Sequence, residues 1–441
     1  MSSERAASSA AAAGAALLVR LQAASAPSCR IESVALVDGS ALDKINKTST
    51  IAKVDVRYTK HLLQDAAAAA AAAAAPAETE QEERLVLKVS NGSGAMHGLA
   101  REGVFYAFVA AQDLGGLAKD GSAAAGASLA TVLPRVVCAA GDMTLSTKTI
   151  LMEDLSTDAG CVQAGYFFGA GNPNNWGKDL AAERRGFALT ADEVTALSFS
   201  AAAKLHAPTW NNVNTGLHWL RGAAWREGGA RASWQASQDS VRKMWAGLRE
   251  NIAAGTCKVN MSAALIQCME ASVAKANWDT FQAEVAARPH CLTHGDFHPA
   301  NFMVRPKASM KAGGVSGGDD AAAAHAIVLI DWECVGIGSG PQDLGQFMIS
   351  HVDPEARARM ERGAVEQYYV ELKGLNPDGV AMTLGECFAE YVQGGLGRWL
   401  WFVPMLVNMC PPKMGQFFVD QVAAFIATHG VTEENVPMPR A

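Results

Sequence analysis

The chain has 441 residues, which is enough for two domains or a two-lobed protein with a substantial core. Only 18% of its residues are charged and its formal charge is −7, so we expect no nucleic-acid partner, because such binding depends on clustered Lys and Arg. No apolar run is long enough for a transmembrane helix. The most apolar stretch, residues 399–407, is interrupted by Pro404, and we expect a buried helix there.

The nine cysteines are scattered and form no CxxC pair, a pattern typical of free thiols in a reducing compartment. We therefore expect a cytoplasmic protein. The Ala/Ser-rich segment 1–29 leaves an organellar alternative open, since such a composition also suits a transit peptide. The other interpretation is a leading helix, because Leu17, Leu18 and Leu21 would share one face.

Residues 30–150 are expected to form a β-rich lobe that binds a nucleotide. Apolar and polar side chains alternate in 51–58 and again in 84–89, which is the period of a half-buried strand. Between these strands, residues 66–83 contain ten consecutive alanines followed by an acidic run. We interpret this segment as a low-complexity insertion in a hairpin connection.

Residues 151–435 are expected to form a mainly helical lobe for catalysis and acceptor binding. Thr190-Ala-Asp-Glu193 is a capping box, in which two side chains satisfy free amides at a helix start. Residues 306–325 are rich in Gly and Ala and predict a second insertion, as a surface hairpin. The predicted fold class is α+β and bilobal, with a β-rich N-lobe and a mainly helical C-lobe.

The most informative segment is Leu292-Thr-His-Gly-Asp-Phe-His-Pro-Ala-Asn301, which is followed some thirty residues later by Ile330-Asp-Trp-Glu333. Phosphoryl transfer needs a carboxylate near the attacking hydroxyl and oxygen ligands for magnesium on the nucleotide phosphates. We therefore interpret Asp296 as the catalytic base, and Asn301 and Asp331 as magnesium ligands.

Four further residues near these segments are assigned supporting parts. We group His294 with Asp296 among the catalytic residues, although hydrogen bonds that brace the loop suit it better than proton transfer. His298 either contacts the substrate or is structural. Glu333, on the same side of an extended segment as the metal ligand before it, would assist the metal indirectly, and Asp343 would support the catalytic loop from inside.

The small lobe should supply a cation for the ATP phosphates. Lys88 stands inside an apolar strand and needs a partner, which Glu102 would provide fourteen residues later in a helical segment. The alternative is an edge-strand lysine that points to water. No GxGxxG motif precedes the second strand, so we expect the hydroxyls and amides around Thr48 and Ser49 to hold the phosphates.

The adenine is expected beside the connector that follows the apolar strand 150–155. Backbone groups from Met152 to Asp154 would bind it, and these positions are inferred from chain order alone. The expected cofactors are therefore ATP and Mg²⁺.

In this order, the elements resemble the aminoglycoside phosphotransferase and choline kinase superfamily, which shares the protein-kinase-like fold. The closer resemblance is to its ecdysteroid-kinase-like branch, on residues 101–106, 152–155, 204–207 with Trp210, and 340–344. The resemblance implies ATP-dependent transfer of the γ-phosphate to a hydroxyl of a small molecule, with Asp296 as base and Lys88 at the phosphates. The glycine-rich loop and the Ala-Pro-Glu element of protein kinases are missing, which counts against a protein substrate.

The sequence leaves the acceptor open. We expect it to be bound by residues Tyr166 to Trp176 and by the helices that carry Trp210 and Trp399. The ten tryptophans allow an aromatic cage for a quaternary amine, and they suit an apolar alcohol equally well. A catalytically silent, nucleotide-binding pseudokinase and a protein kinase are the alternatives, and the intact catalytic set argues against the first. Nothing in the sequence indicates the oligomeric state.

Overall fold

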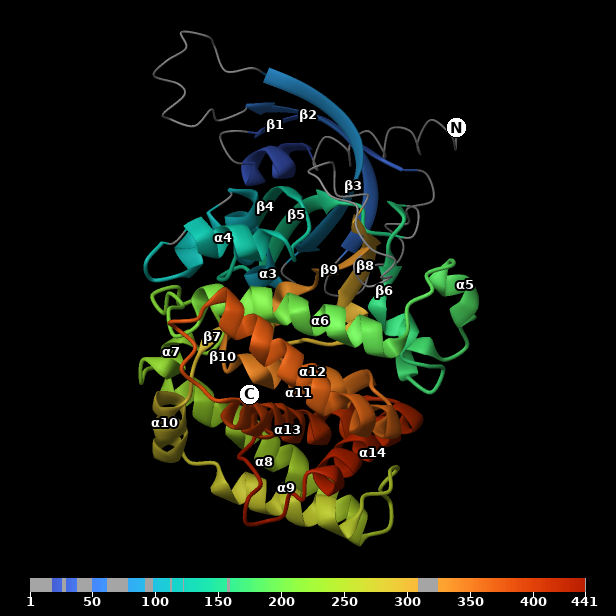
Figure 1. Ribbon diagram of the computed structural model, residues 1–441, viewed down its shortest axis with the longest axis vertical. Coiled ribbons are helices and arrows are strands. Elements are labelled where there is room, and N and C mark those ends of the chain that lie inside the picture. The colour runs from blue at the N-terminus through green and yellow to red at the C-terminus, as the bar shows by residue number, and fades with distance from the viewer. Residues whose placement is uncertain are drawn as a thin grey trace. The chain divides into compact units, whose positions relative to one another are not determined.

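The computed structural model describes residues 18–25, 29–37, 50–61, 78–91, 98–111, 113–121, 123–156, 159–307 and 324–440 (Figure 1). The chain divides into two compact units. The first, here called the sheet unit, comprises Met1–Leu114, Leu133–Ala159 and Asp331–Cys334. The second, here called the helical unit, comprises Gly115–Val132, Gly160–Ile330 and Val335–Ala441.

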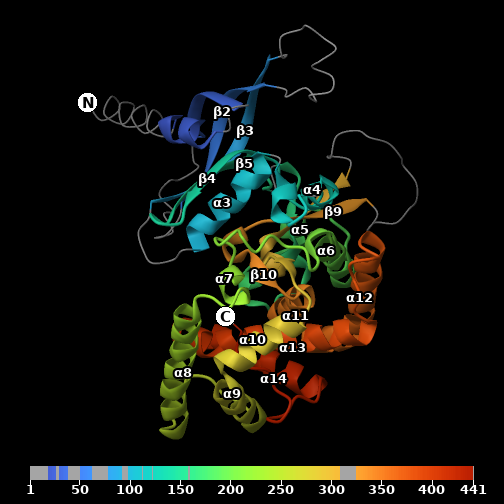
Figure 2. The same cartoon turned by 90° about the vertical axis from the view of Figure 1, so that its left-hand side faces the viewer.

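The sheet unit contains a five-stranded antiparallel sheet in the order β1-β2-β3-β5-β4. Its strands are β1 (Cys29–Leu36), β2 (Thr50–His61), β3 (Glu78–Asn91), β4 (Val136–Asp142) and β5 (Thr147–Glu153). The predicted alternation is confirmed, because Val54 and Val56 on β2 and Leu85 and Leu87 on β3 are buried in one core. Helix α3 (Gly98–Ala110) packs on β4 and β5 (Figure 2).

Strand β3 begins earlier than the sequence pattern indicated. It starts at Glu78 and pairs with β2 through to His61, so residues 78–83 of the predicted insertion are strand. Its first half has no apolar alternation, and it faces β2 with exposed ion pairs such as Arg57 to Glu80 and Glu82. The second predicted insertion likewise begins and ends in strands, β8 (Phe302–Pro306) and β9 (His325–Leu329). Residues 62–77 and 308–323 lie outside the described part of the chain.

A leading helix is present at residues 18–24. Leu21 is fully buried in the core of the sheet. Arg20 Nη2 donates hydrogen bonds to the carbonyls of Ser90 (2.7 Å) on β3 and Lys148 (2.6 Å) on β5. Residues 18–25 of the N-terminal segment therefore belong to the folded sheet unit.

The helical unit holds the remaining elements. Its strands form a three-stranded sheet in the order β6-β8-β9, with β6 at Val162–Gln163, and a pair of β7 (Cys291–Thr293) with β10 (Gly336–Gly338). The longer helices are α4 (Ala123–Ala130), α6 (Ala191–His206), α8 (Arg231–Ala253), α9 (Ala263–Lys275), α10 (Trp278–Ala287), α11 (Gly340–His351), α12 (Pro354–Leu375), α13 (Leu384–Met409) and α14 (Pro412–Thr428). The short ones are α5 (Leu180–Arg184) and α7 (Ala223–Arg226).

Local sequence signals account for several of these helices. The predicted capping box at Thr190 and Glu193 starts α6, and a second one at Thr383 and Glu386 starts α13. Helices α11 and α13 pack closely, because a Cβ on Gly345 would lie 2.4 Å from the carbonyl oxygen of Tyr391. None of the described helices is both long and apolar enough to span a membrane. A sheet unit and a mainly helical unit confirm the predicted α+β class.

Candidate active site

Lys88 on β3 lies within a cluster of carboxylates in the sheet unit. Its Nζ is 2.7 Å from Glu102 Oε2 on α3 and 2.8 Å from Asp331 Oδ1. The expected Lys88–Glu102 ion pair is therefore present, and the lysine does not point to water: its side chain is only 12% exposed. Burial alone would lower the pKa of Lys88, but Glu102, Asp331 and Glu333 outweigh burial and raise the pKa. Lys88 is thus a fixed cation at neutral pH.

A second lysine, which the sequence analysis missed, completes this cluster. Lys148 on β5 is fully buried, and its Nζ lies 2.5 Å from Glu102 Oε2 and 2.7 Å from Glu333 Oε1. Lys88 pairs with Ile150 across the sheet, two residues beyond Lys148, so both lysines project from the same face. A lysine inside the apolar strand Thr147–Glu153 was a usable signal, by the same reasoning that identified Lys88.

Helix α3 fixes the segment that carries Asp331. Arg101 Nη1 donates a 2.9 Å hydrogen bond to the carbonyl of Glu333, and Phe105 stacks on Trp332 with ring centroids 4.3 Å apart. Asp331 itself adopts a left-handed backbone (φ 67°), which non-glycine residues rarely do outside special sites. Glu333 lies in the 3₁₀ helix η8 (Trp332–Cys334), so the expected extended segment is wrong. The reason is this docking of the segment on α3.

The carboxylates of the cluster fit a divalent cation. Oxygens of Glu102, Asp331 and Glu333 lie within 4.8 Å of one another. Three carboxylates against two buried ammonium groups leave one net negative charge, and hard oxygen donors are the ligands that magnesium takes. Asp331 has the most exposed side chain of the three, at 41%, so it is the best placed of them to bind a metal.

In the helical unit, Asp343 holds the loop that follows β7. Its carboxylate accepts hydrogen bonds from the amides of His294 (2.8 Å) and Gly295 (3.3 Å), as expected for an internal support. Gly295 has φ +74°, which a side chain would disfavour, and its carbonyl accepts a 3.3 Å bond from Arg398 Nη2 on α13. Two elements distant in sequence therefore fix the backbone just before Asp296.

Both ring nitrogens of His294 are used within the loop. Nε2 donates to the carbonyl of Ile330 at 2.9 Å, and Nδ1 accepts from the amide of Asp296 at 3.3 Å. This arrangement favours the bracing role over proton transfer.

The Asp296 carboxylate is held by neutral donors. Oδ1 accepts from Gln346 Nε2 and Oδ2 from Asn301 Nδ2, both at 3.1 Å, and His298 Nε2 lies 3.4 Å from Oδ2. Burial alone would raise the pKa of Asp296, but its neighbours, led by His298, lower the pKa. The carboxylate is therefore ionised at neutral pH and can accept a proton. Because the amide nitrogen of Asn301 bonds Asp296, its oxygen is left for another partner.

A cavity of about 310 Å³ lies in the helical unit beside this loop. Residues 168–172, from the predicted acceptor segment, form one side of it, and α11 and α14 form the other. His351 on α11 lines the cavity and stacks on His298, with ring centroids 5.2 Å apart and planes 8° apart. The two imidazoles thus connect the cavity wall to Asp296.

The predicted tryptophans do not line this cavity. Trp210 and Trp399 are 2% and 4% exposed, and Trp399 packs on Phe418 with ring centroids 5.3 Å apart. The aromatic residues that line it are Phe168 and Phe417. Neither indole therefore contacts this cavity, and the expectation that the helices carrying Trp210 and Trp399 help to bind the acceptor stays a prediction.

Two of the residues predicted to contact the nucleotide, Met152 and Asp154, lie on β5 or directly after it. Met152 is buried on β5, where it pairs with strands on both sides. Asp154 follows β5 and forms an ion pair with Lys53, whose Nζ lies 3.2 Å from Asp154 Oδ2. Thr48 and Ser49 lie outside the described residues, so their predicted contact with phosphates stays a prediction.

Residues 200–375 match the family model described as "Phosphotransferase enzyme family". This range contains Asp296, Asn301, Asp331 and Asp343, and the match supports the predicted superfamily. A search of curated proteins found no match. The ecdysteroid-kinase-like branch stays a prediction.

The solved structures that align with the chain include three small-molecule kinases or kinase-family proteins. An ethanolamine kinase from Plasmodium vivax is 8% identical, with a TM-score of 0.39 over 92% of this chain and 82% of the other. A microcompartment-associated aminopropanol kinase is 12% identical, with a TM-score of 0.35 over 93% and 95%. A choline/ethanolamine kinase family protein from Mesorhizobium loti is 13% identical, with a TM-score of 0.27 over 79% and 88%. These values are too low for an inference from the alignments alone.

Proposed function

We propose that this chain transfers the γ-phosphate of ATP to a hydroxyl of a small molecule, with magnesium, because residues 200–375 match the model of a phosphotransferase enzyme family. The observation that carries the proposal is the Asp296 carboxylate. It is ionised, it is oriented by Gln346 and Asn301, and it lies in a loop that Asp343 holds from inside. A carboxylate in this state is what the acceptor hydroxyl requires.

In the proposed reaction, Asp296 accepts a hydrogen bond from the acceptor hydroxyl and takes its proton as the new oxygen–phosphorus bond forms, while the bond between the γ-phosphorus and the β–γ bridging oxygen breaks and ADP leaves. Lys88, fixed by Glu102, binds the phosphates of the nucleotide. Asp331 and Asn301 are the proposed magnesium ligands. The metal, when bound, neutralises charge on the transferred phosphoryl group.

We propose the 310 Å³ cavity as the acceptor pocket, a size that suits a small metabolite. Its lining combines the rings of Phe168 and Phe417 with the carboxylates of Asp353 and Asp420. These two acids disfavour a phosphorylated or carboxylated acceptor by like-charge repulsion, so an uncharged or cationic alcohol is the better candidate. A cytoplasmic location is proposed from the cysteine pattern.

The test is ADP formation from ATP and magnesium by the full chain, with and without a deproteinised extract of small metabolites. Turnover that the extract stimulates, and that Asp296→Asn abolishes, is the expected result. Asp239→Asn, an exposed aspartate on α8, is the matched control and should leave turnover unchanged. Extract-stimulated turnover that survives Asp296→Asn would contradict the assignment of the base, and nucleotide binding without any turnover would instead favour a pseudokinase.

A further inference from the structure

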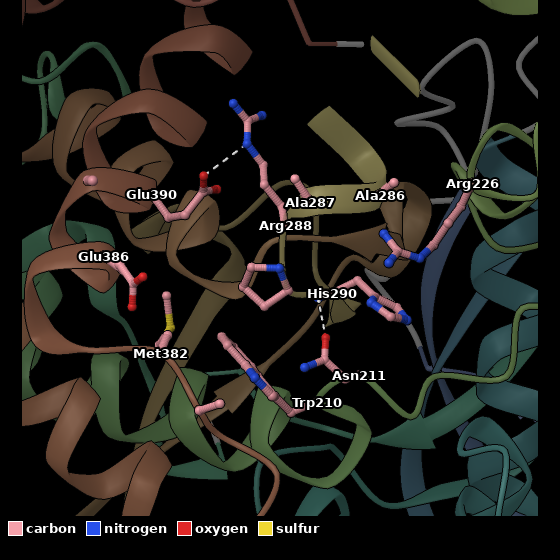
Figure 3. Close-up of a pocket in the computed structure, with 13 residues that line it drawn as sticks. Trp210, Asn211, Arg226, Ala286, Ala287, Arg288, His290, Met382, Glu386 and Glu390 are labelled. Atoms are coloured by element: carbon pink, nitrogen blue, oxygen red, sulfur yellow. Dashed lines mark hydrogen bonds and ion pairs between the residues drawn. The ribbon is translucent and has the colours of Figure 1, made fainter. Parts of the chain in front are cut away.

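A second, larger cavity lies in the helical unit, and it shares no lining residue with the proposed acceptor pocket (Figure 3). Its volume is about 580 Å³. Its walls come from the chain after α6 at Trp210 and Asn211, from Arg226 on α7, from residues 286–290 at the end of α10 and just after it, and from residues around the start of α13. Residues 286–290 lead directly into β7 and the catalytic loop.

Two of the charged side chains that line this cavity, Arg288 and Glu390, pair with each other. Arg288 Nε lies 3.0 Å from Glu390 Oε1 (Figure 3). Its Nη1 lies 2.8 Å from Glu284 Oε2. Glu386 closes the capping box of α13 with Thr383. The other oxygen of Glu390, Oε2, lies 3.8 Å from Arg440 Nη1.

Among the described residues, Arg226 lacks an acidic partner, and the ring of His290 lacks a hydrogen-bond partner. Arg226 donates through Nη1 to the carbonyl of Val285 at 2.9 Å, and no acidic side chain of the described residues pairs with it. Burial lowers the pKa of Arg226. Both ring nitrogens of His290 are buried and have no hydrogen-bond partner in the described part of the chain. Buried polar atoms are rarely left in that state.

The two groups face the same space. Figure 3 shows the guanidinium of Arg226 beside the imidazole of His290 at one side of the cavity. Burial, together with the positive charges of Arg226 and Lys119, lowers the pKa of His290 to about 4, so this ring is neutral at pH 7 and can donate or accept a hydrogen bond. An arginine that lacks a counter-ion next to a neutral donor suits an anion. Pro289 and Trp210 also line the cavity and supply apolar surface.

We propose that this cavity binds a compact organic anion, whose carboxylate or phosphate pairs with Arg226 and bonds His290 while its apolar part contacts Trp210 and Pro289. Arginine forms bidentate hydrogen bonds to both kinds of anion, and these are among the stronger hydrogen bonds in proteins. Mostly apolar walls with a few convergent polar groups are typical of small-molecule sites. The site is independent of the phosphotransfer proposed above.

Isothermal calorimetry on the full chain tests this with benzoate, which carries a carboxylate on a flat apolar ring. Benzamide is the matched neutral probe, and ionic strength is held constant. Benzoate should bind saturably, and benzamide roughly 10-fold or more weakly, as expected for loss of one charge-assisted hydrogen bond. Arg226→Gln should weaken benzoate by a similar factor, while Arg231→Gln, at an exposed position outside the cavity, should not change it.

Ala287→Trp is a second variant, because Ala287 lines the cavity and is itself exposed, so the change fills space without removing a contact. It should also weaken benzoate, and circular dichroism checks that each variant is folded. Equal binding of benzamide and benzoate would overturn the anion assignment. Binding that persists in both Arg226→Gln and Ala287→Trp would place the anion elsewhere, and the absence of saturable benzoate binding would overturn the proposal altogether.

Discussion

Lys148→Met tests whether the buried lysine holds the charge cluster of the sheet unit together. Lys148 is fully buried between Glu102 and Glu333, so its removal leaves three carboxylates facing only Lys88. Breaking a buried ion pair by removing one partner costs about 3–5 kcal/mol. Because Glu102 keeps Lys88 at 2.7 Å, we expect the lower end, a loss of about 3 kcal/mol in the free energy of unfolding.

Urea unfolding followed by circular dichroism measures this loss. Lys53→Met is the matched control: Lys53 pairs with Asp154 at 3.2 Å but is 29% exposed, so its removal should cost about 1 kcal/mol or less. Adding Glu333→Gln to Lys148→Met removes one of the uncompensated carboxylates and should recover part of the stability. A loss for Lys148→Met no larger than that of Lys53→Met would refute the proposed role of the lysine.

Three further predictions concern the loop, the leading helix and acid stability. Asp343→Asn should lower kcat roughly 10-fold or more, because Asn offers one acceptor to the two amides that Asp343 now binds; an unchanged kcat would contradict this. Leu21→Ala should cost about 2–5 kcal/mol in urea unfolding, since Leu21 is fully buried; unaltered stability would mean that the leading helix contributes nothing to the core. The free energy of unfolding should fall as the pH drops from 6.5 towards 4, because the unfolded chain protonates His290 in that window while the native state, with the pKa of His290 lowered to about 4, does not. His290→Gln should flatten this part of the pH profile. An unaltered profile would show that His290 is not its cause.

Local patterns in the sequence account well for the strands and the ion pair of the sheet unit. Alternation identified β2 because Val54 and Val56 are buried, and a charge inside an apolar strand identified Lys88. The first half of β3 was not predicted as strand, because cross-strand ion pairs stabilise it and charged side chains give no alternation of apolar and polar residues. The extended conformation predicted for the segment of Glu333 was wrong because the segment packs on α3, a tertiary contact that local sequence does not reveal.

The catalytic loop was predictable from its spacing, whereas its supports were only partly so. Gln346 donates to Asp296 from fifty residues away, and Arg398 reaches Gly295 from a helix a hundred residues further on. No spacing rule connects such positions, since only the packing of α11 and α13 brings them to the loop. The same holds for the stacking of His351 on His298.

The most direct test of the central claim is transfer of ³²P from γ-labelled ATP to a small molecule. The full chain, magnesium and a fractionated metabolite extract are incubated together, and labelled products are separated from ATP and phosphate. We expect one phosphatase-sensitive small-molecule product, reduced about 10²- to 10⁴-fold by Asp296→Asn with nucleotide binding retained. Label that appears in protein, or a product that forms equally well with Asp296→Asn, would contradict the account.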